Sequence, residues 1–125
     1  NAFIKKARRV RKAFGGGMRQ AGMLAAAAAY ALDNHVERLA VDHDNAQKVL
    51  EAGLKNQWVE GALPVETNIV VLLLKNGITN TEFLEKLNSK GILAVGFGPQ
   101  RVRLTMHLDV SEADVNTICE TLLSL

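Results

Sequence analysis

Apolar residues recur every three or four positions at the start of the chain. Phe3, Ala7, Val10 and Phe14 follow this spacing, which predicts an amphipathic helix over residues 2–14 with a basic outer face. The glycine run 15–17 ends that helix. The alanine-rich stretch from about 18 to 32 has very high helix propensity, and its small side chains would let other helices pack closely. It is therefore predicted to be a buried or bridging helix.

The pattern continues with a third helix and then changes to strands. Residues 69–74 are a continuous run of branched apolar residues, typical of a buried strand, and residues 101–108 alternate between apolar and polar. Residues 92–97 predict a short strand, and residues 55–65 are expected to be a loop. Thr79 and Ser111 each begin a capping box at the start of a helix. One apolar stripe of the third helix, which ends near Gly53, comprises Val36, Leu39, His43, Ala46 and Leu50.

This order, three helices followed by β-α-β-β-α, predicts a fold of the α/β class, or α+β for the segment taken alone. The small sheet is expected to carry its helices on one face. We expect residues 1–32 and residues 33–125 to form separate parts. Because the chain begins at Asn1 without an initiator methionine, it is expected to be a fragment of a longer protein.

Charge is distributed unevenly along the chain. Residues 1–32 hold seven of the 15 lysines and arginines and no acidic residue, whereas all 13 aspartates and glutamates follow. A basic end suits an anionic partner such as a phosphorylated ligand, a nucleic acid or a membrane surface. Aromatic residues make up only 5% of the chain and none interleaves with the charges, so single-stranded nucleic acid is not an expected partner. No stretch is long and apolar enough to span a membrane.

The glycine run offers the first candidate site. Glycines let backbone N–H groups approach a ligand, and the start of a following helix favours an anion. Lys12 and Arg19 flank the run and would add two charges, so Gly15–Gly17 are a candidate phosphate site. The spacing fits neither a P-loop nor a dinucleotide fingerprint, and a flexible turn between two helices explains it equally well.

Arg103 offers the second candidate site, because a guanidinium can bind a carboxylate through two parallel hydrogen bonds. From the alternation alone, a polar strand surface facing solvent is the favoured explanation. His43 lies on the predicted apolar stripe and is expected to be a core histidine, while His107 is either a site residue or a hydrogen bonder at a strand end. No histidine or cysteine pair has metal-ligand spacing, so no metal is expected. Cys119, the only cysteine, is expected to be a buried structural thiol, which fits a reducing compartment.

Several blocks, taken together, resemble the low-specificity threonine aldolases and follow the order of that family. The resemblance implies a pyridoxal 5′-phosphate enzyme of the aspartate-aminotransferase fold type (fold type I), which cleaves threonine or allo-threonine to glycine and acetaldehyde. It further implies that Lys12 and Arg19 reach the cofactor phosphate of a neighbouring subunit and that Arg103 holds the substrate carboxylate. The blocks are residues 15–22, Tyr30-Ala31-Leu32, residues 42–46, residues 66–70, residues 102–104 and residues 107–110.

One departure from the family matters for activity. The lysine that forms the Schiff base lies upstream in the family, in a Ser-Lys-Gly stretch, and Ser89-Lys90-Gly91 repeats that tripeptide in the wrong part of the sequence. The chain is therefore similar to the C-terminal part of such an enzyme: residues 1–32 would end the large domain and residues 33–125 would form the small domain. The resemblance implies a missing N-terminal large domain, a homo-oligomer (dimer or tetramer), a cytoplasmic location and no nucleic-acid or membrane partner. No residue of the chain is expected to be catalytic, and the chain alone is expected to be inactive.

Two alternatives remain open at this point. The first is a small non-enzymatic α/β module that binds a phosphorylated effector through the Gly15–Gly17 turn. The second is a basic fragment that binds nucleic acid.

Overall fold

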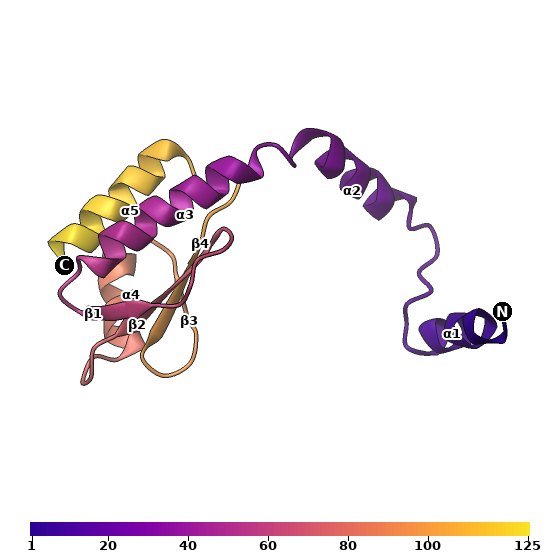
Figure 1. The fold of residues 1–125 in the computed structure, drawn as a ribbon, viewed down its shortest axis with the longest axis horizontal. Coiled ribbons are helices and arrows are strands. Elements are labelled where there is room, and N and C mark those ends of the chain that lie inside the picture. The colour runs from indigo at the N-terminus through magenta and orange to yellow at the C-terminus, as the bar shows by residue number, and fades with distance from the viewer. The chain divides into compact units, whose positions relative to one another are not determined.

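The computed structural model describes residues 1–125, which divide into two units, residues 1–37 and residues 38–125. The first unit holds two helices, and the second holds three helices and a four-stranded sheet, so the predicted mixed α/β class is confirmed (Figure 1). The elements are α1 (Ala2–Ala13), α2 (Gly22–Asn34), α3 (Leu39–Leu54), β1 (Val59–Ala62), β2 (Ile69–Leu74), α4 (Asn80–Ser89), β3 (Val95–Gly96), β4 (Arg101–Thr105) and α5 (Glu112–Ser124).

Neither helix of the first unit buries a residue within this chain. The apolar stripe of α1 is present as predicted but exposed, with Phe3 and Phe14 each at least 80% exposed. The alanine-rich helix α2 starts at Gly22 rather than near Met18, because Gln20 has a left-handed φ of 49° that no helix accommodates. Helix α2 was predicted to be buried or bridging, but it buries no residue within this chain.

The sheet of the second unit has the order β1-β2-β4-β3, and every neighbouring pair is antiparallel. Val71 of β2 lies opposite Arg103 of β4, and Val95 of β3 lies opposite Arg103 on the other side. Strand β1 falls in the stretch predicted to be a loop. Its pairing with β2 is irregular between Val59 and Gly61, and this irregularity removes the alternation by which a strand is recognised in sequence.

The core lies between one face of the sheet and the three helices α3, α4 and α5. Alternate residues of the two central strands belong to this core and are at most 2% exposed: Val70 and Leu72 on β2, and Val102 and Leu104 on β4. Helix residues from α3, α4 and α5 complete it (Figure 1). The intervening residues of both strands, Arg103 among them, lie on the opposite face of the sheet, which no helix of this unit covers. We call this surface the open face; its residues on β2, β3 and β4 are Ile69, Val71, Leu73, Val95, Arg101, Arg103 and Thr105, together with Phe97 just after β3.

Both predicted capping boxes are present. The backbone N–H and hydroxyl of Thr79 donate to Glu82 at 2.9 and 2.8 Å, and those of Ser111 donate to Asp114 at 2.9 and 2.6 Å. These hydrogen bonds lower the pKa of Glu82, mainly through the backbone of Thr79, and the pKa of Asp114, mainly through the side chain of Ser111. Each box therefore stabilises its helix start with an ionised carboxylate.

The predicted face of the third helix is wrong by part of a turn. His43 is exposed, while its neighbour Asp42 is 3% exposed and points inward with Asn45, Ala46 and Val49. Asp42 accepts two hydrogen bonds from the Arg38 guanidinium, at 2.8 and 3.0 Å, so its charge is compensated where it is buried. The predicted stripe omitted Arg38 and Asp42. It placed His43 in the core, whereas the preceding residue, Asp42, is the one that is buried.

Candidate functional site

Arg103 lies in the middle of β4, on the open face of the sheet. Its side chain is partly buried, and its Nε atom is shielded from solvent without any hydrogen-bond partner. A buried polar group without a partner costs free energy, and such groups are uncommon in folded proteins. Arg103 also has no acidic partner: the ion pairs of the chain are Arg38 with Asp42 and His107 with Asp109. The structure thus leaves a cation with an unused, desolvated donor on a surface that no helix of this unit covers.

Two neighbours of Arg103 on the open face, Val71 and Phe97, are apolar. Val71, directly opposite on β2, is only 7% exposed although no helix lies on this face. The Cζ atom of Arg103 lies 5.8 Å from the ring centre of Phe97, within the range of a cation–π interaction. An anion bound here would meet an arginine in a partly dry setting, where a charge-assisted hydrogen bond is stronger than in water.

The glycine run has a different role from the one its sequence suggested. The N–H of Gly15 donates to the carbonyl oxygen of Lys12 at 3.2 Å, and the N–H of Gly16 donates to that of Arg11 at 2.8 Å. With Gly15 at a φ of +80°, this is the Schellman motif that ends a helix. Helix α2 begins only at Gly22, so the glycines do not form the start of a helix. Two of the three glycine amides are therefore already used within α1.

The close approach at Gly16 explains why a second glycine is needed. A Cβ atom added there would lie 2.8 Å from Cγ and 3.1 Å from the carbonyl oxygen of Arg11. Close contact with Arg11, and not a ligand, accounts for this glycine. The alternative of a phosphorylated effector held by the amides of the Gly15–Gly17 turn loses its main donors.

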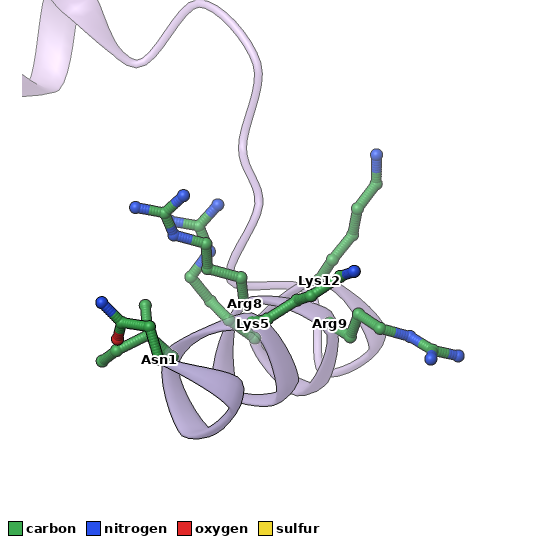
Figure 2. A pocket seen from close by; sticks show the side chains of 7 residues that line it. Asn1, Lys5, Arg8, Arg9 and Lys12 are labelled. Carbon is green, nitrogen blue, oxygen red and sulfur yellow. The ribbon is translucent and has the colours of Figure 1, made fainter.

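Lys12 and Arg19 are both exposed, on α1 and in the segment that leads to α2. Figure 2 shows Lys5, Arg8, Arg9 and Lys12 projecting from α1 near Asn1. No ion pair engages any of these residues. Their charges are available to an anion, while Arg103 belongs to the second unit.

The remaining candidates do not form a reactive cluster. Nδ1 of His107 accepts a hydrogen bond from the N–H of Asp109 at 3.3 Å, so this histidine bonds the chain just after β4. Cys119 is partly buried on α5, and burial raises the pKa of its thiol. No three residues among the histidines, cysteines, aspartates and glutamates lie together as a metal site would require.

Two residues, one beside Arg103 and one that supports the loop after β3, were not anticipated from the sequence. Phe97 contacts its guanidinium, and the Asn80 side chain donates to the carbonyl oxygen of Gly98 at 3.0 Å, beside Phe97. The only signal in the sequence for this contact was that an aromatic residue, Phe97, ends the short apolar run 92–97. Its position relative to Arg103 depends on the pairing of β3 with β4.

The second unit is thus an α/β unit with one open sheet face that carries an arginine without an ion-pair partner, and a basic helical segment precedes it in the chain. The chain belongs to the beta-eliminating lyase family, whose pattern matches residues 1–76. It is similar to the low-specificity L-threonine aldolase of Escherichia coli strain K12, at 44% identity over 87% of this chain and 31% of that protein. Low-specificity L-threonine aldolase 1 of Arabidopsis thaliana is 38% identical over 92% of this chain and 33% of its own length. The low-specificity L-threonine aldolase of Candida albicans is 30% identical over 97% of this chain and 31% of its own.

These comparisons confirm the resemblance to low-specificity threonine aldolases that the sequence blocks indicated. The chain spans about a third of the length of the curated relatives it matches. No helix has the length and apolar character needed to cross a bilayer.

Proposed function

We propose that this chain is the C-terminal part of a pyridoxal 5′-phosphate-dependent threonine aldolase. The complete enzyme would cleave threonine or allo-threonine to glycine and acetaldehyde. The observation that carries the proposal is the identity of 30–44% to three threonine aldolases, spread over 87–97% of the chain. Such coverage means that the similarity extends over most of the chain and does not rest on a single motif.

The residues of the first unit fit the phosphate of the cofactor. Lys12 and Arg19 are exposed cations without acidic partners, and no acidic residue occurs before position 33. The Gly15 and Gly16 amides are engaged in the end of α1, so the phosphate would be held by charged side chains and not by those amides. When bound, the cofactor supplies the electron sink for carbon–carbon bond cleavage.

Arg103 would bind and orient the substrate carboxylate. A guanidinium presents Nε–H and one Nη–H along one edge, in the spacing of two carboxylate oxygens. The Nε atom of Arg103 has no protein partner and no acidic residue pairs with the guanidinium, so the positive charge of Arg103 is left for a carboxylate to neutralise. Orientation of the carboxylate fixes which substrate bond faces the reacting centre.

The remaining parts of the proposal concern what this chain lacks. We infer that a large domain with the Schiff-base lysine is missing, and that the enzyme is a homo-oligomer in which Lys12 and Arg19 serve a neighbouring subunit. The cytoplasm is the expected location. The 125-residue chain alone would gain no visible absorbance band with pyridoxal phosphate and would release no glycine from threonine.

A chimera tests the proposal. Residues 1–125 would replace the matching part of the Escherichia coli relative, and acetaldehyde release from threonine would be measured. We expect activity, and we expect Arg103→Leu to raise KM by about 10- to 100-fold because a charge-assisted pair contributes about 1.5–3 kcal/mol. Arg101→Leu, on the same face and exposed, is the matched control and should change KM little. An Arg103→Leu chimera with the KM of the unsubstituted chimera would remove Arg103 from the carboxylate site.

A further inference from the structure

Arg103 and Phe97 meet because of the hairpin that joins β3 to β4. The N–H of Phe97 donates to the carbonyl oxygen of Arg101 at 2.9 Å, and Val95 lies opposite Arg103. Phe97 and Arg103 are therefore diagonal neighbours on the open face, at a separation that long and aromatic side chains can bridge. The measured 5.8 Å between the Arg103 Cζ atom and the ring centre shows that they do.

The loop that carries Phe97 is held at several points. Gly98 and Gln100 have φ angles of +87° and +55°, which turn the chain within three residues. The side chain of Gln100 donates to the Lys75 carbonyl oxygen at 3.1 Å, and that of Asn80 donates to the Gly98 carbonyl oxygen at 3.0 Å. These contacts connect the loop to the rest of the unit, so the ring of Phe97 has a fixed support.

An aromatic partner has a consequence that an acidic partner would not have. A carboxylate beside Arg103 would neutralise the guanidinium and compete with any anion that binds there. The face of a ring attracts the cation while the N–H groups at its edge remain free for an acceptor. Since Arg103 has no ion-pair partner in the chain, Phe97 is the group that orients its charge.

We propose that Phe97 is a positioning residue: it contacts the Arg103 guanidinium without neutralising it and so keeps that cation oriented for a substrate carboxylate. This inference rests on the proposed function of Arg103. It adds a residue that determines how tightly an amino-acid substrate is bound, and it assigns the short β3–β4 hairpin a role in the site.

The contact can be tested directly on the 125-residue chain by nitrogen-15 NMR. The Nε–H signal of Arg103 is identified by its loss in Arg103→Lys, and the exposed Arg101 provides an internal reference. We expect the Arg103 Nε–H to exchange with water more slowly than that of Arg101. Phe97→Leu should bring the two rates together, while Phe97→Tyr should keep them apart. Equal exchange rates in the unsubstituted chain, or unchanged protection in Phe97→Leu, would overturn the proposal.

The functional consequence is tested in the chimera described above. Phe97→Leu should raise KM for threonine by about two- to fivefold, the range of a partly exposed cation–π contact, with kcat little changed. Phe97→Tyr should restore KM, and Leu123→Ala, which removes an exposed apolar side chain from α5, is the control. An unchanged KM in Phe97→Leu while Arg103→Leu raises KM would overturn this inference alone. If Arg103→Leu also leaves KM unchanged, the proposed role of Arg103 in carboxylate binding fails, and the NMR exchange rates still decide whether Phe97 holds Arg103.

Discussion

Replacing Arg103 by leucine separates two roles that a partly buried arginine can have: support of the fold and readiness for a ligand. In the chain alone, the shielded Nε–H of Arg103 has no acceptor. An unpaired donor of this kind costs about 1–3 kcal/mol, whereas the contact with Phe97 contributes about 0.5–1 kcal/mol. Leucine removes both terms and keeps an apolar side chain opposite Val71. We therefore expect Arg103→Leu to leave the free energy of unfolding unchanged or to raise it by up to about 2 kcal/mol.

The assay is urea unfolding of the 125-residue chain, followed by circular dichroism and checked by thermal unfolding. For a unit of this size, each kcal/mol corresponds to about 4–8 °C in Tm. Arg101→Leu, at an exposed position of the same strand face, is the control, and its stability should stay within about 0.5 kcal/mol of the unsubstituted chain. A loss of more than about 1 kcal/mol in Arg103→Leu relative to Arg101→Leu would show that the guanidinium supports the fold, and the argument from its unpaired donor would be refuted.

Three further outcomes follow from other contacts. A Cβ atom at Gly53 would lie 2.7 Å from Cδ2 of the fully buried Leu72. Gly53→Ala should therefore lower the free energy of urea unfolding by up to about 2 kcal/mol, because the crowding outweighs the gain in helix propensity. Equal or higher stability would refute this. Because the pKa of Asp114 is lowered in the folded chain, its contribution to the free energy of unfolding is present above the ordinary pKa and is lost as the pH falls below about 4. Asp114→Asn should therefore reduce the fall in the free energy of unfolding at acid pH. An unchanged fall would contradict the cap. Burial raises the pKa of the Cys119 thiol, so a disulfide reagent at pH 8 should modify the folded chain more slowly than the urea-unfolded chain, and equal rates would argue against its burial.

Local signals predicted the parts of the fold that depend on neighbouring residues. Strand β2 spans Ile69–Leu74 as expected from its apolar run, and Thr79 and Ser111 form the capping boxes that their spacing indicated. Strand β1 was missed because it is defined by pairing with β2, and its irregular register around Gly61 hides the alternation. A strand that exists through a partner distant in sequence leaves little trace in its own residues.

The candidate site shows the same division. Alternation placed Arg103 on the polar face of its strand, but only the packed structure shows that its Nε is shielded and unpaired and that Phe97 contacts it. The glycine run gave the opposite result. Its composition indicated amides free for an anion, whereas Gly15 and Gly16 donate their N–H groups to carbonyl oxygens of α1. Sequence cannot distinguish a glycine that serves a ligand from one that ends a helix, because both need the same backbone freedom.

The two edges of the sheet determine how copies of this chain behave in concentrated solution. One edge is β3, which is two residues long, and the other is β1, whose pairing with β2 is irregular. Short and distorted edges resist strand-to-strand addition, so the sheet does not propagate sideways into a ribbon of many chains. Of the surfaces of the sheet, this leaves the open face for contact between copies, and there exposed Ile69 and Val95 lie among the cations of Arg101 and Arg103. Two such faces repel each other at low ionic strength, and added salt weakens that repulsion. Dilute buffer therefore disfavours contact between two open faces, and added salt promotes it.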